Sequence, residues 1–215
     1  MKRIISILLI LIISIAALTS CGDKKYDEAE VKAAAKELIK SSVMLNEIYW
    51  GEGIPYTDDK NTSDGSFYMA LDSYCYLKGF TNLDELKAIT EKTFSKEFCK
   101  SQIYSSVLAN VQDGTDTAFL TRYYQKYDVD DLKTPEYIMV NTNWEQLLYG
   151  DVEYDYESIK VIGSEKETVY VTLNATVTLD DLAPQTREIR VSLVEEDDGW
   201  RLDSPTYLTY IKNTN

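Results

Sequence analysis

Apolar and polar residues alternate strictly in the C-terminal third of the chain. In "TVYVTLNATVTL" (168–179) one set of alternate positions is apolar: Val169, Val171, Leu173, Ala175, Val177 and Leu179. Tyr or polar residues occupy the positions between them, and this two-residue period predicts a strand with one buried face. "SIKVIG" (158–163) predicts the strand before it, and "REIRVSLVEEDDGWRLDSP" (187–205) predicts a hairpin that turns at Asp198-Gly199.

A helical period precedes this region. Residues 27–50 have capping-box spacing at Asp27 and Glu30, and Gly51 follows them. One stripe then recurs at three- and four-residue steps: Val31, Ala35, Leu38, Ser42, Leu45 and Tyr49. We expect a sheet to cover this long stripe; a helix that binds a partner is the alternative.

The middle of the chain mixes weaker signals. Segments 81–95, with Asn82 and Glu85 in capping-box spacing, and 95–111 predict two further helices. We interpret 53–65 as a loop, and 66–80 as a strand or irregular extended segment. Segment 113–150 is loop-rich, and short strands are predicted in "AFLTRYYQKYD" and "EYIMVN".

Helices followed by an antiparallel meander predict an α+β domain, with N-terminal helices packed on a C-terminal, bent antiparallel sheet. This order of elements resembles the cystatin-like and nuclear-transport-factor-2-like folds. One domain over residues 27–215 is consistent with the length of 215 residues.

The N-terminus has the features of an export signal. Lys2 and Arg3 precede an apolar run, residues 4–17, that is too short for a permanent membrane helix of about 20 residues. "LTSCG" (18–22) resembles the lipobox of bacterial lipoprotein precursors. The resemblance implies cleavage between Ser20 and Cys21, a diacylglyceryl group on Cys21, and a tether over residues 21–26 after a signal peptide of residues 1–20. An ordinary secretory signal or a buried apolar helix is the alternative.

The predicted location is therefore the extracytoplasmic face of the cell membrane, with a lipid anchor. A two-chain lipid is sufficient to hold a protein there, whereas one chain binds marginally. Without Lys2 and Arg3 the chain keeps 20 basic and 36 acidic residues, a net charge of −16. Such a charge disfavours nucleic acid and anionic headgroups as partners.

The types of reactive side chain in the sequence argue against catalysis. The chain contains no histidine, which excludes Ser-His-Asp and Cys-His catalysis and histidine metal sites. We expect no cofactor, no metal and no catalytic residue. Cys75 and Cys99 form either a disulfide, which an extracytoplasmic setting permits, or two buried thiols. The weaker alternative is a carboxylate-dependent glycan hydrolase, with candidate acids in two clusters: Asp151, Glu153, Asp155 and Glu157, and Asp128, Asp130 and Asp131.

Seventeen tyrosines are the other unusual feature. Tyrosine is enriched at recognition surfaces, and in "YGDVEYDYESI" (149–159) it alternates with acids. Structural filling of half-exposed strand positions explains these tyrosines equally well.

The runs "YDYESIKVIGSEKETVYVTL" and "VSLVEEDDGWRLDSPTY" resemble the C-terminal part of small lipoproteins of low-GC Gram-positive bacteria that are similar to inhibitors of DL-endopeptidases, which are cell-wall hydrolases. The resemblance implies that Trp200 closes the core, that Arg201 points outward and that Asp203-Ser204-Pro205 ends the strand; it implies no binding residue. The predicted function is a non-catalytic binding or inhibitory module toward a cell-wall hydrolase or another envelope protein. A small-ligand pocket on the concave side of the sheet is the alternative.

Overall fold

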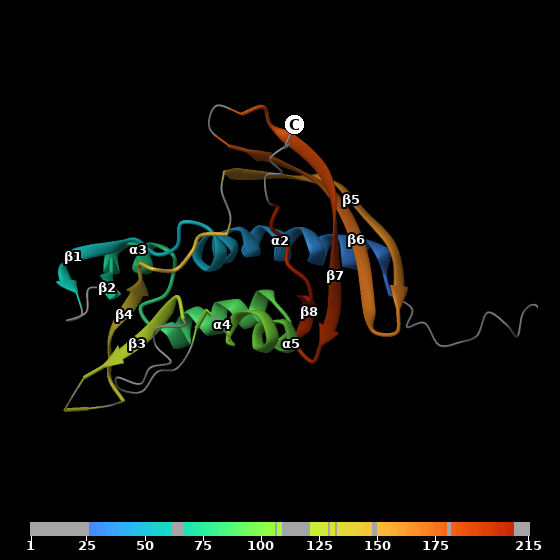
Figure 1. Ribbon diagram of the computed structural model, residues 1–215. Coiled ribbons are helices and arrows are strands. Elements are labelled where there is room, and N and C mark those ends of the chain that lie inside the picture. Colours follow the sequence, from blue (N-terminus) through green and yellow to red (C-terminus); the bar gives the residue numbers. More distant parts are fainter. Residues whose placement is uncertain are drawn as a thin grey trace, which may run out of the picture.

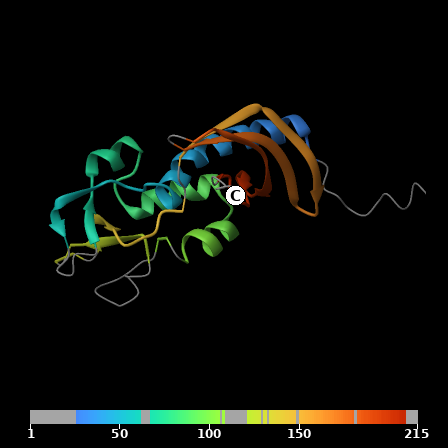
Figure 2. The same ribbon diagram turned by 45° about the horizontal axis from the view of Figure 1, so that its top comes forward.

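The computed structural model describes residues 26–61, 67–105, 107–108, 121–128, 130–131, 133–147, 150–179 and 182–208. These residues form an α+β arrangement with two four-stranded antiparallel sheets. Figure 1 and Figure 2 show the two sheets toward opposite ends of the long helix α2 (Glu28–Trp50). The prediction of an α+β chain is confirmed, but the expected single C-terminal sheet is not the whole picture, because residues 56–141 form a second sheet.

Helix α2 begins and ends where the sequence predicts. The Asp27 side chain accepts hydrogen bonds from the amides of Ala29 and Glu30, which caps the helix. Glu30 does not complete the capping box, because its carboxylate accepts a hydrogen bond from the indole Nε1 of Trp200 at 3.0 Å. The predicted stripe is buried except for Leu38, and Ile39 takes that inward position.

The C-terminal sheet has the strand order β5-β6-β7-β8, and every pair is antiparallel. Its strands are β5 (Asp151–Glu165), β6 (Thr168–Thr178), β7 (Gln185–Glu196) and β8 (Gly199–Leu202). The predicted alternation in β6 is confirmed, since Val169, Val171, Leu173, Ala175 and Val177 are all buried. The predicted hairpin is also confirmed, but its two-residue turn is Asp197-Asp198, one residue earlier than predicted, because Gly199 already pairs with Glu196 as the first residue of β8. Strand β5 is longer than the six residues predicted.

The other sheet has the order β1-β2-β4-β3. Its strands are β1 (Tyr56–Asn61), β2 (Phe67–Ala70), β3 (Tyr123–Tyr127) and β4 (Pro135–Asn141). The short strands predicted in segment 113–150 are confirmed. The interpretation of segment 53–65 as a loop is wrong for β1, whose backbone pairs with β2 from Tyr56 opposite Ala70.

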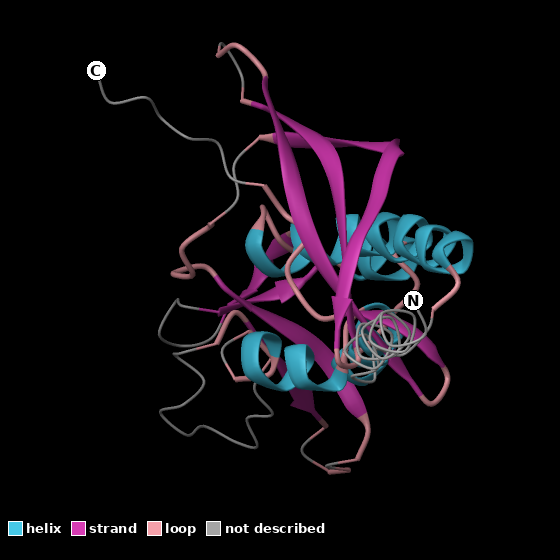
Figure 3. Cartoon of the chain, turned by 90° about the vertical axis from the view of Figure 1, so that its right-hand side faces the viewer, coloured by secondary structure: helices cyan, strands magenta, loops and turns pink. Residues whose placement is uncertain are grey.

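The short helices all lie between β2 and β3 in the chain, two strands of the same sheet, whereas the chain passes to the C-terminal sheet after β4. These helices are α3 (Asp72–Leu77), α4 (Leu83–Thr93), α5 (Lys96–Phe98) and the π-helical turn η1 (Cys99–Ile103). The helix predicted from segment 81–95 is confirmed. The helix predicted from segment 95–111 is confirmed only as far as Ile103, because Leu108 forms a β-bridge with Tyr123. The extended interpretation of segment 66–80 holds only for β2, because α3 follows it. Figure 1 and Figure 3 show α2 between the arch of the β5–β8 sheet and the helices α4 and α5.

Ser42, the one polar residue in the stripe of α2, secures the C-terminal segment. Its hydroxyl lies 2.7 Å from the hydroxyl of Thr206, which also accepts a hydrogen bond from Asn46. The carbonyl of Thr206 accepts a further bond from the Tyr154 hydroxyl. All four residues are buried, and the three hydroxyl groups and the Asn46 Nδ2 find hydrogen-bond partners inside the core, whereas the Asn46 Oδ1 has none.

The positions of Trp200 and Arg201 are the reverse of those that the family resemblance implies. Arg201 is buried, and its guanidinium donates to the carbonyls of Glu91 and Trp200 and pairs with Asp198 at 2.6 Å. Trp200 is only partly buried and packs at the edge of the core. The expectation fails because Arg201 supplies the hydrogen-bond donors that the end of α4 requires, whereas the Trp200 indole faces Glu30.

Candidate interaction surface

The acids of β5 do not meet in a cleft. Asp151, Glu153, Asp155 and Glu157 are all exposed along one side of the strand. Glu157 forms an ion pair with Lys36 at 2.6 Å, and this partner lowers the pKa of Glu157. A pair of catalytic carboxylates requires one group whose pKa is raised, so this arrangement gives no support to glycan hydrolysis.

The second acidic cluster shapes a turn. The Asp128 carboxylate accepts a hydrogen bond from the amide of Asp130, and Asp131 accepts from the amide of Lys133 and the hydroxyl of Thr134. These hydrogen bonds lower the pKa of Asp131. Side-chain oxygens that satisfy their own backbone in this way are typical of turns.

The two described cysteines are free thiols, so the disulfide alternative is wrong and the alternative of two buried thiols is confirmed. Burial raises the pKa of Cys75 to about 11 and that of Cys99 to about 12. Both thiols are therefore protonated and poor nucleophiles at neutral pH. Ser20 and Cys21, the predicted cleavage and lipidation residues, lie outside the described residues.

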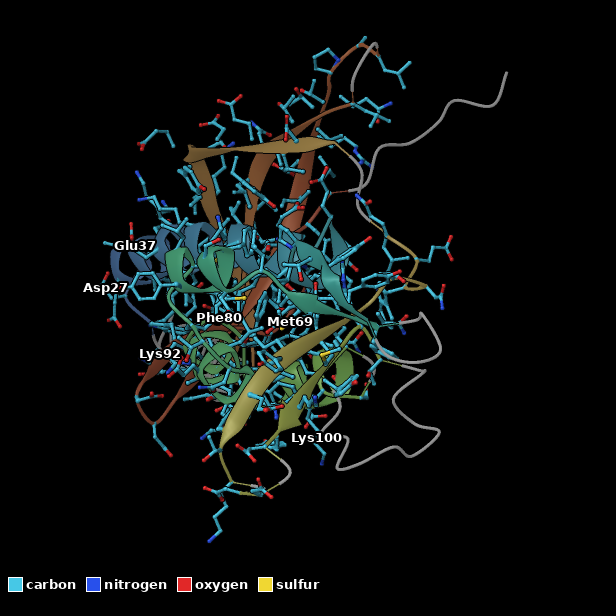
Figure 4. The ribbon with its side chains drawn as sticks, turned by 90° about the vertical axis from the view of Figure 1, so that its left-hand side faces the viewer. Asp27, Glu37, Met69, Phe80, Lys92 and Lys100 are labelled. Carbon is cyan, nitrogen blue, oxygen red and sulfur yellow. The ribbon has the colours of Figure 1, made fainter. Side chains whose placement is uncertain are left out.

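Among the large apolar side chains of the described residues, the two most exposed lie on α3. Tyr76 is 76% exposed and Leu77 is 81% exposed, while Cys75 beside them is buried at 3%. Together with Tyr56, Tyr68 and Leu71 we name this surface the α3 patch. Leu71 and Tyr56 are also exposed, and the Tyr56 and Tyr68 rings lie 5.0 Å apart. Figure 4 looks onto the end of the molecule at which this patch lies.

The backbone beneath the α3 patch is well supported. The amide of Leu71 donates to the carbonyl of Pro55 at 2.8 Å, which joins the start of α3 to the start of β1. At the other end, the Phe80 amide donates to the Cys75 carbonyl, and Phe80 is buried. Gly79 lies between them at φ +88°, a backbone conformation that glycine adopts without strain. Because this backbone is already fixed, binding would order only the exposed side chains and not the backbone that carries them.

Acidic residues surround this base. Tyr74, on α3, has a raised pKa, first because of burial and then because the carboxylate of Glu47 is near; Glu52 adds to the effect. Asp72 lies in the first turn of α3. The ammonium of Lys78 lies over the Tyr74 ring, 5.4 Å from its centroid. Glu47, Glu52 and Asp72 outnumber the two cations near Tyr74, which are Lys78 and the buried Arg122, so the rim of the patch favours a basic partner surface.

A buried arginine stabilises the C-terminal end of α2, which is the end near the α3 patch. Arg122 donates from Nη2 to the carbonyl of Gly51 at 2.8 Å, and burial lowers its pKa. Gly53, at φ +89°, leaves no room for a Cβ beside the Arg122 guanidinium and the Tyr123 hydroxyl. That hydroxyl donates to the Ile48 carbonyl and accepts from the Ile54 amide. The turn after α2 is thus fixed by β3, which positions β1 and the patch.

The concave side of the β5–β8 sheet is filled by protein. Val31, Ala35 and Ile39 of α2 are completely buried in one core cluster with Val171 and Leu173 of β6. A small molecule bound at the centre of this face would have to displace α2. The small-ligand alternative therefore gains no support from the inner face of the sheet.

Sequence reasoning missed the α3 patch, because "DSYCYL" was interpreted as extended. The signal was present: Gly79 is a helix-stop residue, and Leu71 and Cys75 are spaced by one helical turn.

Comparison of the chain with protein-family models, with curated proteins and with solved structures found no match. Within the described ranges, no helix has the length and apolar character needed to cross a membrane. The same residues include no group of three or more potential ligands among His, Cys, Asp and Glu that could hold a metal ion.

Proposed function

We propose that this protein is a lipid-anchored extracytoplasmic module that binds an envelope protein through the α3 patch. One observation carries the proposal: Tyr76 and Leu77 are almost fully exposed on a firmly supported helix. Exposed apolar side chains gathered on one surface of a soluble domain mark sites of protein interaction. The acidic rim selects a partner with a basic surface around an apolar pocket.

The position of the patch is suited to an anchored protein. The chain enters the domain at Tyr26, immediately before α2, while α3 lies toward the far end of that helix (Figure 2). A helix of 23 residues is about 34 Å long. With a lipid on Cys21, the patch points away from the bilayer and toward the cell wall.

The partner class that we propose is a cell-wall DL-endopeptidase, and the mode is occlusion of its cleft without catalysis. The C-terminal resemblance described above supports this choice, as do the net acidic charge and the predicted location. We also propose a cystatin-like or nuclear-transport-factor-2-like relationship for the β5–β8 sheet and α2, since the curved sheet wraps one long helix.

The binding test uses the full chain, solubilised in a non-ionic detergent, with purified wall endopeptidases. We expect inhibition at micromolar concentrations, and we expect Leu77→Ser to weaken it at least tenfold. Leu182→Ser is the matched control, because Leu182 is also an exposed leucine but lies outside the patch. No inhibition by the unmodified chain, or equal loss in both variants, would overturn this assignment.

The anchor is tested separately by metabolic labelling with a clickable palmitate. The label should appear on the unmodified chain and disappear in Cys21→Ala. Labelling that persists in the variant contradicts the anchor but leaves the α3 patch untouched.

A further inference from the structure

A small cavity of about 250 Å³ opens at the end of α2 opposite the α3 patch. It lies between the start of α2, the turn joining β5 to β6, and the hairpin of β7 and β8. Figure 1 shows this turn and the start of α2 at the same end of the molecule. The cavity is lined by Tyr26, Asp27, Glu30, Ser164, Lys166, Glu167, Val169, Glu195 and Trp200.

Aromatic and apolar groups form part of the lining. Trp200 and Tyr26 are each only partly buried, so both rings belong to the cavity as well as to the edge of the core. Val169, which is 3% exposed, adds an apolar surface. The hydrogen bond from Trp200 Nε1 to Glu30 holds the indole in one orientation. The cavity thus combines a fixed aromatic ring with an apolar contact.

Carboxylates outnumber cations in this lining. Asp27, Glu30, Glu167 and Glu195 face a single ammonium, that of Lys166. The start of a helix by itself favours an anion, but the Asp27 carboxylate already accepts from the first amides of α2. Glu195 lies opposite Trp200 in the β7–β8 ladder, so a carboxylate and the indole project from neighbouring positions on one face.

We propose that this cavity binds an ammonium group, either quaternary or primary, on a small polar stem. An aromatic face attracts a cation, and adjacent carboxylates neutralise its charge. Sites for drug-sized ligands have volumes of roughly 300 to 1,000 Å³. This cavity is smaller, so its ligand should have about the size of a lipid headgroup. The assignment differs from the α3 patch in place, in chemistry and in ligand.

The ligand has two possible sources, a soluble amine or the headgroup of a lipid. The second source rests on the proposed anchor. Four residues lie between Cys21 and Tyr26, a span of five peptide units, which keeps the cavity within roughly 20 Å of the bilayer. A zwitterionic headgroup carries an ammonium on a short stem, and its binding would hold the domain upright on the membrane.

Binding is measured by ¹⁹F NMR of the full chain, which is labelled with 5-fluorotryptophan and held in dodecyl maltoside micelles. The Trp200 signal is identified by its loss in Trp200→Phe. We expect choline and ethanolamine to shift this signal with millimolar affinity, and ethylene glycol to leave it in place. Glu195→Gln should weaken choline binding at least fivefold, while the matched control Glu188→Gln, on the exposed side of β7, should not.

The proposal would be overturned if choline and ethanolamine did not shift the Trp200 signal, or if ethylene glycol shifted it equally. It would also be overturned if Glu195→Gln and Glu188→Gln bound choline with the same affinity. Retention of the unmodified ¹⁹F shifts of Trp50 and Trp144 shows that each variant is folded. Because these arms use micelles and soluble amines, they are independent of the lipid on Cys21.

The source is decided in nanodiscs. In discs of phosphatidylglycerol, added choline should shift the Trp200 signal as it does in micelles. If discs of phosphatidylcholine already give the shifted signal and added choline has no further effect, the headgroup is the ligand. If added choline still shifts the signal in phosphatidylcholine discs, the ligand is a soluble amine. Absence of any shift in either disc, after binding in micelles, would overturn the site in the membrane-bound protein.

Discussion

The two sheets of this protein use their residues differently. The β5–β8 sheet has strands of up to 15 residues and buries one continuous face against α2. The β1–β4 sheet has strands of four to seven residues, and its neighbour α3 exposes Tyr76 and Leu77. Regular alternation thus accompanies burial, while short strands accompany the exposed surface. From this difference we expect the C-terminal sheet to provide most of the stability, while the proposed contact surface lies beside the other sheet.

The first prediction tests where the stability resides. Leu193→Ala, in β7, removes a side chain that is completely buried. We expect the free energy of unfolding to fall by about 3 kcal/mol, because the change loses apolar burial and leaves a cavity. Urea unfolding of the full chain in non-ionic detergent measures it. A loss below about 1 kcal/mol would place the main core elsewhere.

The second prediction asks whether the two sheets unfold together. Burial raises the pKa of Cys75, on α3, to about 11 and that of Cys99 to about 12. Unfolded thiols ionise near 8.5, roughly, so above that pH the unfolded chain releases protons that the folded chain keeps. The two thiols therefore leave the free energy of unfolding unchanged below pH 8. Between pH 9 and 10 they together lower it by about 2 kcal/mol.

Urea titrations at these pH values give the slope. Buried tyrosines such as Tyr49 and Tyr123, whose pKa values burial also raises, add to this slope, so Cys75→Ala and Cys99→Ala should each remove about 1 kcal/mol of the fall and leave the tyrosine contribution. If the Cys75 contribution appears in a separate, earlier transition, then α3 and the β1–β4 sheet unfold on their own. A slope that is identical in both variants and in the unmodified chain would contradict the burial of the thiols.

The third prediction concerns a strained residue in the more stable sheet. Lys166 has φ +56° in the two-residue turn between β5 and β6. A left-handed conformation costs a non-glycine residue about 1 to 2 kcal/mol, partly offset by the greater freedom of glycine in the unfolded chain. Lys166→Gly should raise the urea midpoint by an amount equivalent to about 0.5 kcal/mol. Glu167→Gly, the neighbouring control without a positive φ, should lower it.

The smallest expected effect lies in the α3 patch. Leu77→Ala should change the free energy of unfolding by less than about 0.5 kcal/mol, because the side chain contributes surface and little burial. Urea unfolding beside Leu193→Ala makes the contrast between the two regions direct. A loss as large as that of Leu193→Ala would mean that Leu77 is part of the core.

The same contrast between the two sheets explains which elements were predictable from the sequence. Strand β6 and helix α2 were predictable, because each buries one face and so carries a clean two- or 3.6-residue period. Strand β1 was not, since "YTDDKN" owes its structure to pairing with β2. Pairing between distant segments overrides local preference, and short strands carry too few residues to show a period.

The candidate sites were predicted less well than the fold. The α3 patch depends on which side of a six-residue helix faces out, and this was decided by Cys75 and Phe80 turning inward. The cavity at Trp200 joins residues from positions 26 to 200, so no local pattern identifies it. Trp200 and Arg201 exchanged their expected roles because the acceptors they meet, Glu30 and the end of α4, lie far away in the sequence.

The row of acids on β5 has a consequence for crowded membranes. β5 is an outermost strand, with Asp151, Glu153, Asp155 and Glu157 spaced at every second residue. An edge strand has unpaired backbone N–H and C=O groups, so a second copy can pair a strand with it, which leads to aggregation. With the proposed lipid anchor, molecules confined to two dimensions would collide often, and like charges repel at close range. This negative border would therefore keep neighbouring molecules apart as single, separately diffusing units.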